Sequence, residues 1–506
     1  MARSHKKSHP EISLRTLFPR AGWQHCQDIV CRRAVRRPAE IRSGDLYAVF
    51  ETEDVDSLAG AVQARQFGAT ALLVEQLLPL DVPQCIVPNV PAAYARVRQA
   101  LAGDPAEVLS PIAVVGSLGK TVASWLISGV LGESAVCGFR GTLGCSDGTE
   151  FVPGAGDGDW PADTALWLAA CVKAKATHAV MEVPFAALAR QELAGLGFSA
   201  ICLTNLFRHA GEDHAAWARS RENFTAIMNF LRAGGTCVAN IDDPFCRELS
   251  QTRGVPVLTV ALGRTADVTA RLLERSLAEQ TFLLTAGAET VPVRTRLTGD
   301  AHLEACLLAA GVGLLRGLSL VEIARGLETV EQIPGRWERI EAGQPFGVFV
   351  DAANNAESLN STLESLRGVT AGRLITVFGT NGGVPLRQRA RIGQTLEAMS
   401  DLVVMTDGWH PTDDSAALVL DLLKGCESLE QVVRKPDRAH AIRWALAEAR
   451  PGDVVLVAGP DNGPFPGVEG GDLSRDDREV IHSWLAEYNR HFPLVATNRQ
   501  SAAKNR

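Results

Sequence analysis

The sequence has no long apolar run, no paired cysteine motif and no excess of basic residues. No stretch approaches the ~18 consecutive apolar residues that a membrane-spanning helix needs. No apolar segment follows the basic start Met1–Pro10, as it would in a signal peptide. The 11 cysteines are scattered without a C-x-x-C pair, which argues against a disulfide framework or a zinc site. We therefore expect a cytoplasmic protein.

Acidic residues outnumber basic ones, and the formal net charge of −8 gives no electrostatic support for binding nucleic acid. Basic residues gather in two local clusters, Arg32, Arg33, Arg36 and Arg37, and Arg387, Arg389 and Arg391. Such clusters are usually solvated surface, although the second could receive an anionic substrate.

A length of 506 residues predicts about three domains, at roughly 150 residues each. Strand patterns alternate with helical ones, which predicts an α/β fold with mostly parallel sheets. We expect a small mixed α/β N-terminal domain (1–105), a central domain with a mostly parallel sheet (106–333), a C-terminal Rossmann-like α/β domain (334–493) and a flexible polar tail (494–506).

Short apolar runs and helical periodicity locate the expected elements. In the first block these are strands at 45–50, 71–74 and 84–87, a helix near 57–67, and turn residues at 87–91. The second has strands at 112–115, 178–183, 200–204 and 236–240, and helices at 164–175, 215–231, 301–316 and 320–327. The third has strands at 348–350, 374–378, 402–406 and 454–458, and helices at 359–366, 390–398, 415–423 and 439–449.

The segment Gly116–Thr121 has the residue types of a phosphate-binding loop. Its glycines allow backbone N–H groups to turn toward phosphate oxygens, and the expected helix at 122–130 would add its dipole. Lys120 can reach the β- and γ-phosphates, and the Thr121 hydroxyl can ligate Mg²⁺. The full pattern has a glycine at the position of Val114. A glycine-rich turn ending in a surface lysine is the alternative, but the flanking strand and helix favour nucleotide binding.

This loop resembles the shortened G-T-N-G-K-T loop of the Mur ligase family, with only Ser117 and Leu118 changed. Further segments resemble family motifs in the family's own order: 42–47, 141–144, 181–183, 187–189, 204–206, 240–244, 334–338, 350–353 and 476–480. The resemblance is closest to the UDP-N-acetylmuramoyl-tripeptide synthetases.

The resemblance implies an ADP-forming ligase of peptidoglycan precursor synthesis. ATP would phosphorylate the carboxylate of a UDP-linked muramoyl-peptide-like substrate, and the amine of an amino acid would attack the acyl phosphate. The implied site residues are Lys120 and Glu182 for catalysis; Gly116, Ser117, Leu118, Gly119, Lys120, Thr121, Arg336 and Asp351 for ATP; and Thr121, Glu182 and His209 for Mg²⁺.

Several of these residues have an alternative interpretation. Glu182 could simply end a strand, Arg336 could be a surface residue after a turn, and Asp351 could cap a turn. For Asp477 and Arg478 we favour the start of the last helix, where an aspartate caps free N–H groups.

Other segments depart from the family pattern. Pro184 and Phe185 replace two serines, and His209 stands one place early in the metal-binding segment. Where the family has a carbamylated lysine, this chain has residues 223–226, and no lysine lies between Lys175 and Lys424. Residues 408–411 lack the arginine that grips diaminopimelate, so diaminopimelate is an unexpected substrate here. The alternative to an active ligase is a non-catalytic paralogue that binds nucleotide and serves as a scaffold or regulator beside other cell-wall ligases.

Overall fold

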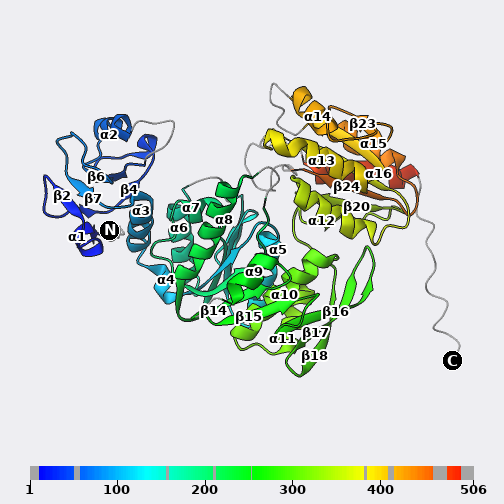
Figure 1. Ribbon diagram of the computed structural model, residues 1–506, viewed down its shortest axis with the longest axis horizontal. Helices are drawn as coiled ribbons and strands as arrows, with labels where there is room; N and C mark the ends of the chain where they lie inside the picture. The colour runs from blue at the N-terminus through cyan, green and yellow to red at the C-terminus, as the bar shows by residue number, and fades with distance from the viewer. Residues whose placement is uncertain are drawn as a thin grey trace, which may run out of the picture. The chain divides into compact units, whose positions relative to one another are not determined.

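The computed structural model describes residues 11–50, 57–154, 159–208, 212–251, 254–380, 384–407, 415–459 and 476–491. Packing divides them into two compact units. The first holds the described residues up to Phe207 with His214–Thr269 and Leu307–Gly326. The second holds Ala270–Cys306 and the described residues from Leu327 onward, with Arg208 and 212–213. The predicted α/β class is confirmed. Figure 1 labels the elements. The division into domains at residues 105, 333 and 493 remains our proposal.

The first unit begins with a small mixed sheet. Its order is β2 (Gly22–Gln24), β7 (Gln84–Ile86), β6 (Ala71–Val74), β5 (Leu46–Ala48) and β4 (Ala34–Val35), with β2 antiparallel and the rest parallel. Alternate residues of the strands pack on α3 (Val90–Leu101) and on α2 (Ser57–Gln66), so the helices cover opposite faces. Short elements complete this part: β1 (Ile12–Ser13), α1 (Leu14–Leu17), β3 (Val30–Cys31), η1 (Pro38–Glu40) and α4 (Pro105–Val108).

The turn residues at 87–91 lie where the chain passes from β7 to α3, and the helix begins within this segment. The Asn89 side chain accepts a hydrogen bond from Ala92 N (2.7 Å) and caps α3, while Pro91 stands in the first turn. Proline is favoured in a first turn, where its missing N–H would have no partner within the helix. The same residues that indicate a turn in sequence therefore start α3.

A larger, mostly parallel sheet forms the middle of the first unit. From β11 to β15, its order is β11 (Phe151–Pro153), β10 (Gly144–Ser146), β9 (Cys137–Gly141), β12 (His178–Glu182), β8 (Ser110–Val115), β13 (Phe198–Leu203), β14 (Leu231–Asn240) and β15 (Val257–Ala261), and β16, β17 and β18 follow in sequence order. The six neighbouring strands β9, β12, β8, β13, β14 and β15 are parallel to one another. Strands β10 and β11 are added to this sheet in antiparallel pairing. Residues 112–115 of β8 are fully buried, as predicted.

Helices cover both faces of this sheet. One face packs against α6 (Trp160–Lys173), α7 (Phe185–Ala189), α8 (His214–Ala226) and α9 (Pro244–Ser250). The other carries α5 (Lys120–Gly132) and the second half of α10 (Asp300–Leu315), where Gly311 packs against Val238. The turn η2 (Ile227–Phe230) and helix α11 (Leu320–Thr329) complete the set. The predicted helix at 215–231 is too long, because its last residue already begins β14.

Strands β16 (Val268–Arg275), β17 (Gln280–Ala286) and β18 (Glu289–Thr295) were not predicted. β17 and β18 form an antiparallel hairpin in the second unit. The next sheet, also in this unit, has the order β19 (Glu338–Arg339), β20 (Gly347–Asp351), β24 (Val454–Ala458), β21 (Leu374–Thr380), β22 (Leu402–Asp407) and β23 (Val432–Arg434). Only β19 is antiparallel within it.

Helices α12 (Ala356–Arg367), α13 (Leu386–Met399) and α14 (Ser415–Leu423) pack on one face of this second sheet, and α15 (Arg438–Glu448) and α16 (Asp477–His491) on the other. Figure 1 shows this layered arrangement. The predicted Rossmann-like architecture of the C-terminal part is confirmed.

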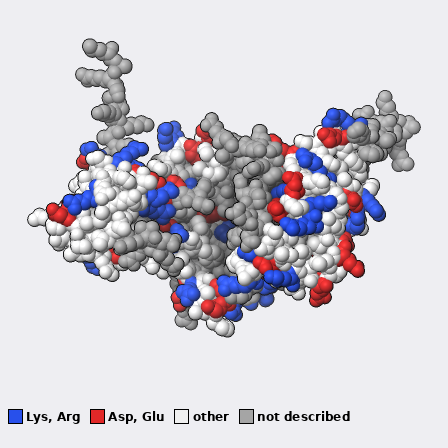
Figure 2. All heavy atoms as spheres, turned by 90° about the horizontal axis from the view of Figure 1, so that it is seen from above, with Lys and Arg blue, Asp and Glu red and all other residues white. Residues whose placement is uncertain are grey.

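Both basic clusters have carboxylate partners. Arg36 pairs with Glu192 at 2.9 Å and is largely buried, so it is not solvated surface, and Arg389 pairs with Asp421 at 2.9 Å. On the face drawn in Figure 2, basic and acidic side chains are interspersed. Among the described residues drawn on that face there is therefore no extended basic surface of the kind that follows a nucleic-acid backbone. Over the described residues, none of the helices combines the length and apolarity required to cross a membrane.

Candidate active site

The glycine-rich segment lies where β8 ends and α5 begins, at the carboxyl end of the first unit's buried parallel strands. Gly119 adopts a left-handed conformation (φ +77°) directly before Lys120, the first residue of α5. Backbone N–H groups at such a junction point away from the helix and attract anions. The structure thus has the strand, turn and helix that the phosphate-loop prediction required.

The end of the neighbouring strand β13 holds this loop in place. Asn205 accepts from Ser117 N through its carbonyl (3.0 Å) and from Leu118 N through Oδ1 (2.8 Å). The Thr204 hydroxyl donates to Leu118 O at 2.7 Å. A Cβ on Gly116 would lie 1.8 Å from Thr204 Oγ1, so only glycine fits there. The segment 204–206 resembles a family motif in sequence, but nothing in its residue types indicates this role.

Lys120 folds back over its own loop. Its Nζ donates to Gly116 O at 2.6 Å and to Ser117 O at 3.3 Å. The ammonium group is therefore held above the turn that a phosphate would enter. A phosphate oxygen offers it a stronger, charge-assisted partner than a peptide carbonyl does.

Thr121 and Glu182 come together although 61 positions separate them. The Thr121 hydroxyl donates to Glu182 Oε2 at 3.3 Å and lies 3.0 Å from Thr142 Oγ1. Glu182 Oε1 accepts from Thr142 N at 3.1 Å. A Cβ on Gly141 would lie 2.0 Å from Glu182 Oε1, which explains the glycine. Thr142 is a site residue that the sequence analysis did not single out.

This pair of oxygen donors suits a hard cation. Mg²⁺ takes one or two protein oxygens and completes its shell with water and phosphate oxygens, and a hydroxyl beside a carboxylate matches that need. Within the described part of the chain, no cluster of three or more histidine, cysteine, aspartate or glutamate side chains could hold a metal by itself. His209, the third predicted ligand, lies outside the described residues, as do residues 408–411.

Arg336 and Asp351 form a second local cluster, at the end of β20. Asp351 accepts from Trp337 N (2.8 Å) and Ala353 N (2.9 Å), and Gly335 O accepts from Ala352 N (3.0 Å). Burial raises the pKa of the Asp351 carboxyl, and Arg336 opposes the rise. These bonds fix the 334–337 turn to the strand, which agrees with the alternative of a turn-capping aspartate.

Trp337 closes this cluster. Its backbone is in the left-handed region (φ +51°), and its indole stacks on His302 at 5.4 Å with an interplanar angle of 6°. His302 is 7% exposed, and burial lowers its pKa to about 4.

The last helix begins at Asp477, as predicted, but the capping residue is its neighbour. Asp476 Oδ1 accepts from Arg478 N at 2.8 Å, whereas the carboxylate of Asp477 forms a buried ion pair with Arg438. Arg438 had no role in the sequence analysis, because nothing local in sequence marks a partner 39 positions away.

Comparisons with known proteins agree with this geometry. Two family models match the chain, "Mur ligase middle domain" over residues 114–313 and "Mur ligase, glutamate ligase domain" over residues 335–460. The UDP-N-acetylmuramoyl-L-alanyl-D-glutamate–2,6-diaminopimelate ligase of Pseudomonas aeruginosa is 31% identical over 494 residues, which cover 94% of this chain and 99% of that protein.

Solved structures show the same fold. A structure of UDP-N-acetylmuramoyl-L-alanyl-D-glutamate–2,6-diaminopimelate ligase aligns with a TM-score of 0.67 and 21% identity, over 95% of this chain and 100% of that one. The MurF ligase from Thermotoga maritima in complex with ADP aligns with a TM-score of 0.61 and 17% identity, over 91% of this chain and 98% of that one. Because the Pseudomonas aeruginosa ligase is 31% identical to this chain along nearly the whole length of both proteins, the chain belongs to the Mur ligase family.

Proposed function

We propose that the chain is an ATP-dependent, ADP-forming ligase that joins an amino acid to the carboxylate of a UDP-linked muramoyl-peptide-like substrate in peptidoglycan precursor synthesis. The observation that carries this proposal is the loop at 116–121, held by Thr204 and Asn205 beside Thr121 and Glu182. The Pseudomonas aeruginosa relative bears the name of such a ligase. A reaction that consumes ATP and nucleotide-linked precursors would run in the cytoplasm.

In the proposed reaction the chain's own residues bind and orient the phosphates. The loop amides and the α5 dipole attract the triphosphate, and Lys120 exchanges its carbonyl partners for phosphate oxygens. Thr121 and Glu182 would hold Mg²⁺, with His209 as a further candidate ligand. When bound, the cation neutralises charge on the transferred phosphoryl group. Arg336 would contact the phosphates and Asp351 the ribose.

The amino-acid substrate is proposed to differ from diaminopimelate. Residues 408–411 read Gly-Trp-His-Pro and lack the arginine that would bind a carboxylate through two parallel hydrogen bonds. The changes at Pro184 and Phe185 remove two hydroxyl groups from a segment that follows Glu182 directly. The amino-acid substrate is therefore best identified by a screen of all standard amino acids.

The decisive experiment measures the release of ADP and phosphate from ATP when the chain is given UDP-muramoyl peptides together with each standard amino acid or diaminopimelate. Lys120→Ala should abolish release, while Lys173→Ala, an exposed lysine at the end of α6, should leave it unchanged. Full turnover by Lys120→Ala would refute the proposal. Saturable ATP binding in calorimetry without turnover for any acceptor would favour the non-catalytic paralogue instead.

A further inference from the structure

A column of three aromatic side chains joins the helices α7, α8 and α9. Its middle member is Phe224, which is fully buried and is the one buried side chain among the residues of α8, all of which the structure describes. The Phe224 ring centroid lies 5.9 Å from that of Phe185 on α7 and 5.6 Å from that of Phe245 on α9. The attachment of α8 to the rest of the first unit therefore depends largely on this column.

The outer end of the column is covered by an ion pair. The guanidinium carbon of Arg221 lies 4.8 Å from the centroid of the Phe245 ring, which is a cation–π contact. Arg221 Nη2 also donates to both carboxylate oxygens of Glu248 on α9, at 2.7 and 2.8 Å. The column thus extends from α7 to a charged pair at the surface.

The inner end of the column begins three residues after Glu182. Strand β12 ends at Glu182, and α7 begins at Phe185. The carboxylate oxygens of Glu182 accept from the Thr121 hydroxyl and from Thr142 N. Helix α5, which carries Thr121, packs on the opposite face of the sheet from α7, α8 and α9. The proposed cation therefore has its ligands next to one end of the column, and the rings continue away from it.

This column occupies the part of the chain where the family has a further metal ligand. The resemblance implies a carbamylated lysine at residues 223–226, which would help to hold a second metal, but no lysine lies between Lys175 and Lys424. Magnesium takes oxygen ligands, and phenyl rings supply none. The side chains that the structure describes here therefore do not fit a second cation.

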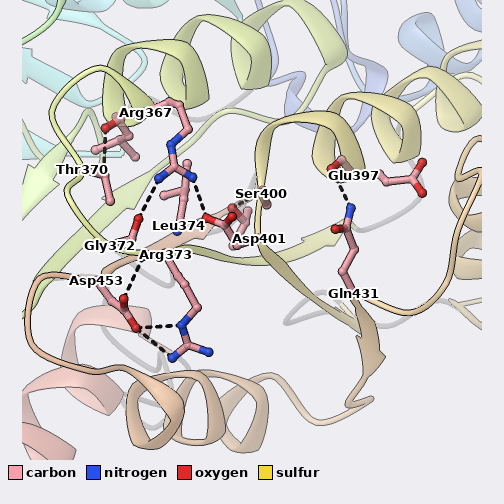
Figure 3. Close-up of polar contacts among 12 residues, drawn as sticks. Arg367, Thr370, Gly372, Arg373, Leu374, Glu397, Ser400, Asp401, Gln431 and Asp453 are labelled. Atoms are coloured by element: carbon pink, nitrogen blue, oxygen red, sulfur yellow. Dashed lines mark hydrogen bonds and ion pairs between the residues drawn. The ribbon is translucent and has the colours of Figure 1, made fainter.

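The column also replaces the connection that such a ligand would make. A carbamate on α8, bound to a metal beside Glu182, would join α8 to the end of β12, whereas the stacked rings join these elements by packing. In the second unit the chain does use charged side chains for such connections: Arg373 donates to Asp453 at 2.8 Å, and Arg367 pairs with Asp401 (Figure 3). Around α8 the connection is apolar and needs no cation.

We propose that this chain works with one divalent cation, held by Thr121 and Glu182, and that the aromatic column of Phe185, Phe224 and Phe245 fills the place of a second. The proposal rests on the proposed ligase function, which assigns the first cation. Since a carbamate forms from an amine and carbon dioxide, neither carbon dioxide nor bicarbonate contributes to cation binding here. Charge on the transferred phosphoryl group is then neutralised by one cation together with Lys120.

The first test counts cations with Mn²⁺ in place of Mg²⁺, using electron paramagnetic resonance to measure the Mn²⁺ that stays free. The unmodified chain, in excess over a non-hydrolysable ATP analogue and with a UDP-muramoyl peptide present, should bind one Mn²⁺ per nucleotide, with or without bicarbonate. Two Mn²⁺ per nucleotide, or a number that rises with bicarbonate, would overturn the single cation and leave the ligase function standing. Failure of the nucleotide to bind would overturn the ligase function itself.

A variant with an added carboxylate tests whether the column fills the second site. Phe224→Glu places two oxygens in the middle of the column and should raise the number of bound Mn²⁺ to two per nucleotide. Thr225→Glu, at the next and exposed position of α8, should leave it at one. If Phe224→Glu does not fold, Phe185→Asp at the half-buried end of the column offers the same comparison. A folded variant of either kind that still binds one Mn²⁺ would contradict the proposed place of the column.

Turnover provides a third measurement. Phosphate release by the unmodified chain should proceed at the same rate in buffer stripped of carbon dioxide and in buffer with added bicarbonate. A severalfold gain in rate on adding bicarbonate would show that a carbamate takes part, and the proposal of a single cation would fall.

Discussion

The hydroxyl of Thr121 donates to the carboxylate of Glu182 at 3.3 Å. The contact exists because β8 and β12 are neighbours in register, with Glu182 opposite Val114, so that the end of one strand faces the helix that follows the other. Two oxygens with a preference for hard cations are thereby set beside the phosphate loop.

The first prediction concerns this contact. Glu182→Gln should lower kcat on the order of a hundredfold, because it removes the negative charge that would help hold the cation against the phosphates. Thr121→Ser, which keeps the hydroxyl, should retain most of the activity. Both are measured by phosphate release over a magnesium titration, where added magnesium should partly restore Glu182→Gln. A Glu182→Gln variant with unaltered magnesium dependence would contradict the metal assignment.

Gly116→Ala should disrupt the loop, because its Cβ would lie 1.8 Å from Thr204 Oγ1. We expect a loss of about 1–3 kcal/mol in unfolding free energy and no measurable ATP binding in calorimetry. Gly132→Ala is the control, since a Cβ there meets nothing within 4 Å at the other end of the same helix. Normal ATP affinity in Gly116→Ala would show that the loop tolerates a side chain.

Asn205→Ala should weaken ATP binding, although Asn205 is not one of the residues proposed to contact the nucleotide. It leaves Leu118 N without its acceptor at 2.8 Å and frees the loop, at a cost of about 1–2 kcal/mol, or roughly tenfold in the KM for ATP. Asn229→Ala, at an exposed position of η2, serves as the comparison and should leave this KM unchanged. An equal KM for ATP in the two asparagine variants would show that the hydrogen bond from Leu118 N to Asn205 does not contribute to ATP binding.

His302 should make stability depend on pH. Burial lowers its pKa from 6.5 to about 4, so between these values the unfolded chain takes up a proton that the folded chain does not. Stability is therefore full above pH 6.5 and falls as the pH drops toward 4, by about 3 kcal/mol. Urea unfolding at several pH values checks this, and His302→Phe, which keeps an aromatic ring beside Trp337, should remove that part of the slope.

The buried parallel strands were the easiest elements to predict. Residues 112–115 and 454–458 are continuous apolar runs because both faces of their sheets are covered by helices. Strand β16 gives no such signal, since Leu272 and Leu273 are both substantially exposed and the expected alternation is lost. At Asn89 the local residues are compatible with a turn or a helix cap, and only the packing of α3 on the sheet decides between them.

The residues of the candidate site likewise fall into those that the local sequence indicates and those that only the fold reveals. Lys120, Thr121 and Glu182 stand in segments whose residue types indicate their chemistry. The roles of Thr142 and Asn205, and the pairing of Arg438 with Asp477, depend on which strands and helices become neighbours. Those contacts join residues between 39 and 87 positions apart, so no local pattern could reveal them. The contacts of Arg336 and Asp351 with the nucleotide stay predictions.

The hold that β13 exerts on the phosphate loop has a consequence for recognising distant relatives. Asn205 and Thr204 hold the backbone of residues 117 and 118, and the Ser117 side chain adds only an acceptor for Phe207 N. The shape of the loop therefore does not depend on one particular pair of side chains at these two positions. A search pattern that insists on their side chains would discard this chain. One that pairs the glycine–lysine–threonine end with a threonine–asparagine some 85 residues later would retain it.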